Sequence, residues 1–318
     1  MREFDWINLA RERFGDRHDG VTVGIGDDCA VLNHAGQTLV SADTVVAGVH
    51  FDLSIMSYED VGWRALAVAL SDLAAGGVDT RRPVHALLCL QAPPDLTDAD
   101  FQDLLSGAQT CAQAHRCSVV GGDTVSTPGP LALSITVLGA TDQPVLRRGA
   151  QPGNLIVVTG PLGAAGVGLK ALREGRDDDN AQACGEAYRR PRARLEYGAL
   201  LAQNATAMID ISDGLAQDLA HVCAASKLGA VIELEDVPVA DATRATAAQV
   251  GLDPLVTAAT FGDDYELIAC IPPARLEWLQ NQIPGLTKVG EMVAGQGMRV
   301  TRGGQTIDLP RPGYQHGS

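Results

Sequence analysis

Apolar positions along the chain alternate between short runs typical of strands and longer stretches with helical spacing. Strands are predicted at residues 38–42, 84–91, 117–120, 131–140, 155–159, 207–211 and 230–234. Helices are predicted between them, at residues 57–75, 97–115, 164–174 and 213–226. The charged residues 173–180 are expected to form a surface loop. This alternation is typical of the α/β class, and we expect an α/β (α+β) fold.

Two of the predicted helices begin with a recognisable capping pattern. Ser57 is followed three residues later by Asp60, and Thr97 is followed in the same way by Asp100. A hydroxyl at the N-cap and an acidic side chain three residues on can satisfy two otherwise unpaired amides. The pattern therefore predicts where both helices start.

A change in composition predicts the domain boundary. Residues 144–153 contain two prolines and two glycines, which are typical of a linker. We therefore expect an N-terminal domain over residues 1–143 and a C-terminal domain over residues 144–318. A length of 318 residues is ample for two domains.

The charge balance argues against some classes of partner. Lys and Arg total 24 and Asp and Glu total 39, for a formal net charge of −15, which disfavours nucleic acid and anionic membranes. The sequence contains no long apolar run typical of a membrane span, and its start lacks the layout of a signal peptide. The 7 cysteines are scattered and form no CxxC pair. We expect a cytoplasmic protein.

Several aspartates are embedded among apolar and small residues, which is unusual for surface charge. They are Asp27, Asp28, Asp43, Asp72, Asp123, Asp210 and Asp213. Two like charges about 4 Å apart repel by about 4 kcal/mol at an effective dielectric near 20. Lys and Arg are scarce beside these motifs, so we expect Mg²⁺ to offset the repulsion. For any single aspartate, a role in a helix cap or turn remains an alternative.

Other motifs leave alternatives open. Gly24-x-Gly26 resembles the start of a dinucleotide fingerprint, but the neighbouring aspartates would repel a pyrophosphate. Gly121-Gly122 either lets the backbone approach a ligand closely or forms a plain turn. His50 either contacts a substrate or is structural. Neither a P-loop nor a GxSxG nucleophile motif occurs.

Taken in order, the motifs resemble those of the thiamine-monophosphate kinase family, within the aminoimidazole-ribonucleotide-synthetase-like (PurM-like) superfamily. The resemblance covers nearly the whole chain. The matching segments are Gly24–Ala30, Asp43–Phe51, Leu70–Ala75, Gly121–Thr124, Arg147–Gly153, Ile209–Leu215 and Gly262–Leu267. The resemblance implies a two-domain PurM-like architecture, with mixed sheets flanked by helices in each domain.

The resemblance also implies a reaction. Members of the family phosphorylate thiamine monophosphate with ATP, giving thiamine diphosphate in the last step of its biosynthesis, and form homodimers through their N-terminal domains. The acceptor is itself an ionised phosphate, so the reaction needs no general base. We expect direct in-line transfer assisted by Mg²⁺.

Residue roles follow from the resemblance, motif by motif. It assigns several Mg²⁺ ions to Asp28, Ser41, Ala42, Asp43, Asp72, Asp123, Asp210 and Asp213, with Ser41 and Ala42 contributing mainly backbone. It assigns ATP to Gly122, Asp123, Arg147 and Ser212, and thiamine monophosphate to His50, Asp263 and Tyr314. The expected catalytic residues are Asp43, Asp72, Asp123 and Arg147.

Arg147 is expected to stabilise charge on the transferring phosphoryl group. The alternative role for its side chain is an ordinary surface ion pair. Two departures from the family pattern bear on the other sites. Ala42 stands where the family often has Thr, and Arg311 where an aromatic residue is expected near the chain end.

The sequence is also compatible with rival functions. Selenophosphate-forming relatives rely on a reactive Cys or selenocysteine near the N-terminus, and hydrogenase-maturation relatives carry a C-terminal Cys where this chain has Ser318. A non-catalytic acidic module is the rival from another class. Such a module would bind ATP with Mg²⁺ but would not turn over thiamine monophosphate.

Overall fold

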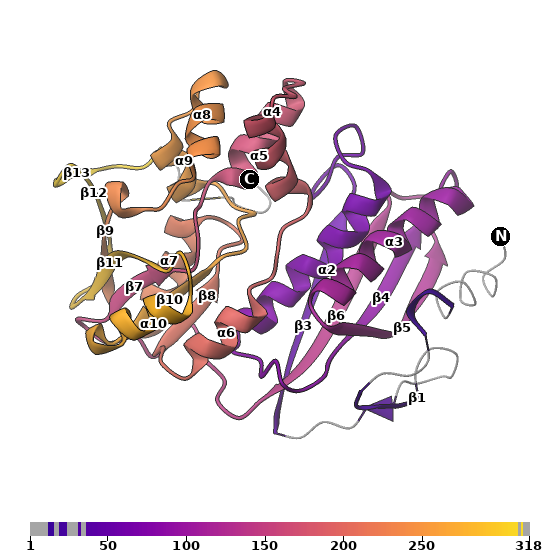
Figure 1. The fold of residues 1–318 in the computed structure, drawn as a ribbon, viewed down its shortest axis with the longest axis horizontal. Coiled ribbons are helices and arrows are strands. Elements are labelled where there is room, and N and C mark those ends of the chain that lie inside the picture. Colours follow the sequence, from indigo (N-terminus) through magenta and orange to yellow (C-terminus); the bar gives the residue numbers. More distant parts are fainter. Residues whose placement is uncertain (1–11, 16–18, 24–30, 33–35, 311–312, 314–318) are drawn as a thin grey trace. The chain divides into compact units, whose positions relative to one another are not determined.

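The computed structural model describes residues 12–15, 19–23, 31–32, 36–310 and 313 (Figure 1). The chain divides into two compact units. The N-terminal unit comprises Met1–Leu73 and Val78–Asp142, and the C-terminal unit comprises Ala74–Gly77 and Gln143–Ser318. Of the predicted site residues, Asp28 and Tyr314 lie outside the described residues.

The N-terminal unit is built on a four-stranded sheet with the strand order β3-β6-β4-β5. Strands β3 and β4 each pair antiparallel with β6, and β4 pairs parallel with β5. A short hairpin of β1 and β2 forms a separate sheet. The elements are β1 (Val21–Val23), β2 (Val31–Leu32), β3 (Gln37–Val46), α2 (Tyr58–Ala75), β4 (Val84–Ala92), α3 (Asp98–Ala114), β5 (Cys117–Ser126) and β6 (Ala132–Thr141).

Helices α2 and α3 lie along one face of this sheet (Figure 1). Successive residues of a strand point to opposite faces. On β3, Val45 faces the helices and is 4% exposed, whereas Val40 points to the opposite face and is 61% exposed. We call these the covered face and the open face of the sheet.

Both capping predictions are confirmed. The amide of Asp60 donates to the Ser57 hydroxyl, and the amide of Ser57 donates to the Asp60 carboxylate, each at 3.1 Å. Thr97 and Asp100 form the same reciprocal pair at the start of α3. Local sequence therefore fixes where the two helices of the N-terminal unit begin.

The strands differ from prediction in two places that matter for the site. Strand β3 continues beyond Asp43 to Val46, so Asp43 lies within the strand and not at its end. Gly121 and Gly122 lie inside β5, so the plain-turn interpretation is wrong. A Cβ on Gly122 would lie 1.8 Å from the carbonyl oxygen of Leu88, so glycine is needed here for close approach to β4.

Strand β5 also contains a β-bulge. Ala86 of β4 pairs with Val119, but the next residue, Leu87, pairs with Gly121. Val120 is the extra residue, and it shifts every later side chain of β5 to the face opposite the one that regular alternation would give. The bulge therefore decides the direction of the side chains that follow it.

The C-terminal unit is built on a seven-stranded mixed sheet with the strand order β13-β12-β9-β11-β7-β10-β8. Only β12 and β9 pair in parallel among these strands. The strands are β7 (Leu155–Val158), β8 (Ala207–Asp210), β9 (Gly229–Glu233), β10 (Leu267–Ile271), β11 (Thr287–Val293), β12 (Gly297–Arg302) and β13 (Gln305–Ile307). Their apolar side chains form the core of this unit with α7 and α9.

The helices of this unit include several that the hydrophobic pattern did not predict. Residues 173–180 were expected to form a surface loop, but α5 begins within this stretch, capped by Asp178. The helical elements are α4 (Ala164–Arg173), α5 (Asp179–Arg189), α6 (Leu195–Ala202), α7 (Leu215–Ser226), η1 (Leu234–Asp236), α8 (Asp241–Gln249), α9 (Pro254–Thr260), η2 (Pro273–Arg275) and α10 (Leu276–Gln282).

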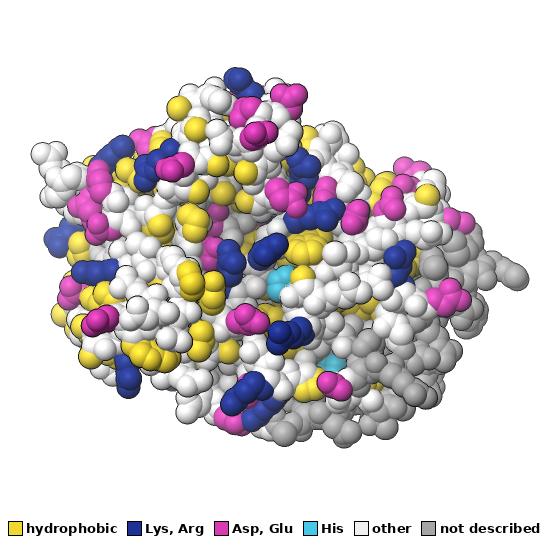
Figure 2. All heavy atoms as spheres, in the orientation of Figure 1, with side chains coloured by type: hydrophobic (Ala, Val, Ile, Leu, Met, Phe, Trp, Pro, Cys, Tyr) yellow, Lys and Arg dark blue, Asp and Glu magenta, His cyan; other side chains and the backbone are white. Residues whose placement is uncertain are grey.

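Acidic and basic side chains are both scattered over the face shown in Figure 2, with apolar side chains between them. Among the residues that the structure describes, no helix is long and apolar enough to cross a membrane.

Candidate functional site

The N-terminal unit brings two of the predicted aspartates together. Asp43 lies on the covered face of β3, and Asp72 lies on α2, which packs on that face. Burial, together with the nearby charge of Asp72, raises the pKa of Asp43 to about 6. The hydroxyl of Ser41 donates a 2.5 Å hydrogen bond to Oδ2 of Asp72. Ser41 and Asp43 share one face of β3, and so both approach the same helix.

This group of oxygens fits a hard divalent cation. Two carboxylates and a hydroxyl are the donor types that Mg²⁺ prefers. Both causes of the raised pKa of Asp43 disfavour its ionised form, so a bound cation would counteract both. Ala42 is exposed on the open face, so its methyl group points away from this pair and only its backbone is left to serve as a ligand.

Asp123 is separated from that pair within the unit. The sheet register aligns Asp123 with Thr44, one row beyond Asp43, and adjacent rows point to opposite faces. Asp123 is exposed on the open face of the edge strand β5, whereas β3 is the opposite edge. Three strand spacings, about 14 Å, separate the two strands. Asp123 and its neighbour Gly122 thus lie apart from the pair of Asp43 and Asp72 within the unit.

His50 follows β3 and is oriented by that strand. The backbone N–H of Val46 donates to Nδ1 of His50 at 3.1 Å. An amide N–H can only donate, so the neutral imidazole carries its proton on Nε2. The two interpretations of His50 are therefore compatible, because Nδ1 has a structural role while Nε2 is a donor of fixed direction.

In the C-terminal unit, the loop after β8 carries the next predicted residues. Asp210 ends β8 and is 4% exposed, and the loop at Ser212–Gly214 leads into α7. Oδ2 of Asp218, on α7, accepts hydrogen bonds from the amides of Ser212, Asp213 and Gly214, each at 3.0 Å. Burial raises the pKa of Asp218 to about 7, although these hydrogen bonds oppose the rise.

Asp218 was not predicted from the sequence. A signal was present in the sequence, since Asp218 shares the helical face of Leu215 and Val222, but acidic residues inside helices usually face solvent. In the structure Asp218 is 2% exposed. The geometry also groups ligand atoms of Asp213, Asp218 and His221 within 4.8 Å of one another.

A second loop of this unit lies against the first. The amide of Asp263 donates to the carbonyl of Ser212, and the amide of Tyr265 donates to the carbonyl of Ile211, both at 2.9 Å. Asp263 and Tyr265 have positive φ values of 69° and 51°. Such conformations are costly for residues other than glycine and cluster at functional sites. The structure thus places predicted ATP and substrate residues, Ser212 and Asp263, side by side.

The segment after Asp263 is anchored by buried polar contacts. Arg194 donates two hydrogen bonds to Glu266, at 3.0 and 2.5 Å, and Glu266 is only 3% exposed. Asp264 accepts from the amide of Gly163 at 2.8 Å, next to the start of α4. Burial raises the pKa of Asp264 to about 8, and the charge of Glu266 contributes. These contacts hold the Asp263 loop to the sheet.

Arg147 is exposed and lies before β7. Its carbonyl oxygen accepts a 3.4 Å hydrogen bond from the Ser226 hydroxyl, which fixes the backbone. Among the described residues, no ion pair of the Arg147 guanidinium is present. The side chain is therefore available for an anion.

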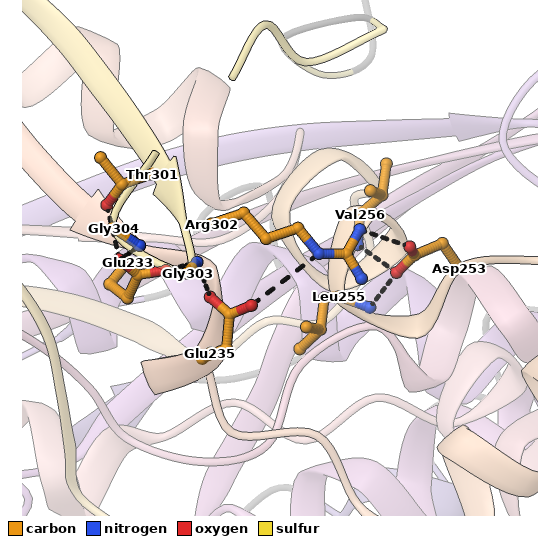
Figure 3. Close-up of polar contacts among 9 residues, drawn as sticks. All are labelled: Glu233, Glu235, Asp253, Leu255, Val256, Thr301, Arg302, Gly303 and Gly304. Atoms are coloured by element: carbon orange, nitrogen blue, oxygen red, sulfur yellow. Dashed lines mark hydrogen bonds and ion pairs between the residues drawn. The ribbon is translucent and has the colours of Figure 1, made fainter. Parts of the chain in front are cut away.

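Another acidic group in this unit has a structural role (Figure 3). The carboxylates of Glu233 and Glu235 both accept the amide of Gly303, at 3.0 and 3.1 Å. Arg302 pairs with Asp253, the N-cap of α9, at 2.7 Å and with Glu235 at 3.8 Å. These acidic side chains therefore hold the β12–β13 turn in place through Gly303 and Arg302.

Comparison with family models places both units in one superfamily. Residues 26–141 match the AIR synthase related protein, N-terminal domain, and residues 151–303 match the AIR synthase related protein, C-terminal domain.

Full-length relatives narrow the comparison. The chain is 35% identical over 327 residues to thiamine-monophosphate kinase of Escherichia coli strain K12, covering 99% of this chain and 98% of that protein. It resembles the crystal structure of thiamine-monophosphate kinase from Stenotrophomonas maltophilia K279a with a TM-score of 0.82 and 32% identity, covering 95% and 96% of the two chains. A structure of AaThiL complexed with AMPPCP and TMP matches with a TM-score of 0.80 and 28% identity over 99% of both chains.

Proposed function

The chain belongs to the thiamine-monophosphate kinase family, and we propose that it transfers the γ-phosphoryl group of ATP to thiamine monophosphate, forming thiamine diphosphate. The observation that carries this proposal is the match over 99% of both chains to a structure holding AMPPCP and TMP. The clustered carboxylates of the N-terminal unit support it, because phosphoryl transfer depends on neutralising negative charge.

We propose that Mg²⁺ is held by Asp43 and Asp72, with backbone of Ser41 and Ala42, and by Asp123, Asp210, Asp213 and Asp28. When bound, Mg²⁺ neutralises phosphate charge and orients the triphosphate. The hydrogen bond from Ser41 to Asp72 supports this assignment, because it orients one carboxylate beside the other.

We propose that ATP contacts Gly122, Asp123, Arg147 and Ser212. The exposed guanidinium of Arg147 is suited to stabilise charge on the transferring group. We assign thiamine monophosphate to His50, Asp263 and Tyr314. The Nε2–H of His50 has the donor chemistry that a phosphate or hydroxyl acceptor requires.

The chain's residues have little proton chemistry to perform in this reaction. The acceptor oxygen of thiamine monophosphate is already ionised, so no side chain needs to remove a proton. We therefore propose direct in-line transfer without a phospho-enzyme, in which the protein binds and aligns two anions.

We also propose a homodimer formed through the N-terminal domain, residues 1–143, which binds ATP and Mg²⁺, with residues 144–318 as the second domain. The open face of the four-stranded sheet supports this, because it exposes Val40 by 61% and Val125 by 45%. The free cysteines among the described residues suit a reducing cytoplasm, which we propose as the location.

An assay of ADP release across several acceptors tests the function. With Mg²⁺ and ATP, we expect release with thiamine monophosphate, formation of thiamine diphosphate, and no release with unphosphorylated thiamine. The Asp72→Asn variant is the matched negative control. Binding of ATP without turnover of thiamine monophosphate would support a non-catalytic nucleotide-binding module instead.

A further inference from the structure

Asp218 fixes a loop to which the proposed function assigns two ligand-binding residues. One oxygen of its carboxylate accepts the three consecutive amides of Ser212, Asp213 and Gly214 at 3.0 Å. Three hydrogen bonds to one buried oxygen leave the loop backbone little freedom. The side chains of Ser212 and Asp213 take their direction from that backbone.

Helix α7 lacks the side-chain N-cap that usually accepts the amides at the start of a helix. Helix α7 has Gly214 at its N-cap, with a φ of 119° and no side-chain cap. A Cβ on Gly214 would lie 3.0 Å from the carbonyl oxygen of Phe261 and 3.0 Å from the carbonyl carbon of Thr260. A capping Ser, Thr or Asp would therefore be strained at this position. The acceptor has to come from within the helix, and Asp218 provides it.

The same loop supports the second one. The carbonyl of Ser212 accepts the amide of Asp263 at 2.9 Å. A Cβ on Gly262 would lie 2.1 Å from that carbonyl oxygen, so the two loops are in close contact. Displacement of the Ser212 backbone would therefore displace Asp263 as well.

We propose that Asp218 is a positioning residue for phosphoryl transfer, holding the Ser212–Gly214 loop so that Ser212 and Asp213 are directed at the nucleotide and its cation. This inference rests on the proposed function for the identity of the ligands. The loop geometry itself does not depend on it.

Direct metal ligation by Asp218 is the competing interpretation, because its ligand atoms lie near those of Asp213 and His221. Oδ2 of Asp218 already accepts three amides, so direct ligation would have to use the other carboxylate oxygen, Oδ1. His221 is exposed on the helix surface. A His221→Gln variant separates the two interpretations, since positioning by Asp218 predicts an unchanged Mg²⁺ requirement.

The test compares Asp218→Ala and Asp218→Asn with the wild-type chain. We expect Asp218→Ala to raise the Mg²⁺ concentration for half-maximal ATP binding by about tenfold, the usual effect of losing a residue that orients a metal ligand. Asp218→Asn retains an acceptor oxygen, so its requirement should stay within about threefold of wild type. Calorimetric titration with MgATP and hydrogen exchange of the 212–214 amides are the two measurements.

Asp253→Ala is the matched control, because Asp253 is also an acid that accepts two helix-start amides in this unit, at Leu255 and Val256. It should lower thermal stability without changing the Mg²⁺ requirement. Unchanged MgATP binding and amide exchange in folded Asp218→Ala would overturn the proposal, as would a tenfold effect of His221→Gln. If Asp218→Ala does not fold, a tenfold effect in Asp218→Asn would overturn it. Failure of the wild type to phosphorylate thiamine monophosphate would refute only the proposed function, since both measurements are made without that acceptor.

Discussion

The hydroxyl of Ser41 donates a 2.5 Å hydrogen bond to Oδ2 of Asp72 and so connects strand β3 to helix α2. Asp43 lies two residues further along the same face of β3, and burial together with the Asp72 charge raises the pKa of its carboxyl group to about 6. One carboxylate is thus oriented by a hydroxyl while the other is destabilised when ionised. A site of this kind favours a cation that engages both.

Replacing Ser41 with alanine should weaken the site without abolishing it. The Ser41→Ala variant keeps both carboxylates but loses the hydrogen bond that orients Asp72. We expect the Mg²⁺ concentration for half-maximal activity to rise by about tenfold, with a smaller change in kcat. Ser106→Ala is the control, since the Ser106 hydroxyl bonds only the backbone of α3 among the described residues. An equal Mg²⁺ requirement in both variants would contradict a role for Ser41.

Substitutions of His50 should separate its two nitrogens. In His50→Asn the amide oxygen stands near the position of Nδ1 and can still accept from Val46, but the Nε2–H is lost. We expect KM for thiamine monophosphate to rise by about tenfold, because one hydrogen bond to a charged group is lost. KM for ATP should stay unchanged. Steady-state kinetics with each substrate varied in turn measure this. A change confined to ATP would place His50 elsewhere in the site.

A charge on the open face of the N-terminal sheet should prevent assembly. Val40 is 61% exposed on that face, and a lysine there would have to be desolvated in an interface. We expect Val40→Lys to sediment as a monomer in analytical ultracentrifugation while the wild type sediments as a dimer. Trp278→Lys is the control, because Trp278 is also exposed, by 47%, but lies on α10 of the other unit. A dimeric Val40→Lys variant would refute this face as the interface.

Asp264 should make stability depend on pH. Its pKa is about 8 in the folded chain against 3.8 for the ordinary group, mainly because of burial. The folded state therefore keeps a proton that the unfolded state has lost, and this stabilisation declines as pH rises from about 4 to about 8. Asp264→Asn removes this titration, so the free energy of unfolding of the variant should fall less steeply with pH than that of the wild type. The two slopes should differ by at most about 1.4 kcal/mol per pH unit.

Urea denaturation at several pH values between about 5 and 8 measures that difference. Asp253→Asn serves as the control, because hydrogen bonds with Arg302 and backbone amides lower the pKa of Asp253 against the effect of burial. Its stabilisation is lost only on acidification below about pH 4, so its slope should match the wild type. Parallel slopes for Asp264→Asn and the wild type would show that Asp264 does not titrate in this range.

The parts of the fold predicted correctly are those with local signals. The start of α2 follows from Ser57 and Asp60, whose contacts lie within one helical turn. The start of α5 had an equally local signal in Asp178, but the charged stretch around it was interpreted as a loop. Beyond residue 234 no element was predicted, although the apolar run Leu267–Ile271, which forms β10, is at least as long as the one at residues 155–159.

The candidate site was only partly predictable, because its geometry depends on pairing between distant segments. The approach of Asp43 to Asp72 requires that β3 continue past Asp43 and that α2 pack on one particular face. Asp218 acts through amides that precede its own helix, and only the folded loop shows that contact. The motifs identified which residue types matter, while register and packing decided which of them meet.

The extra residue in β5 has a consequence for how this protein can change. Without Val120 as a bulge, regular alternation would turn Asp123 beneath the helices, but the bulge turns it to the open face. The surroundings of that carboxylate therefore depend on the register of β5 as much as on the identity of the residue. If Val120 instead paired with Leu87, Asp123 would move opposite Leu90 on the covered face, and the acid would be buried without any change in its motif.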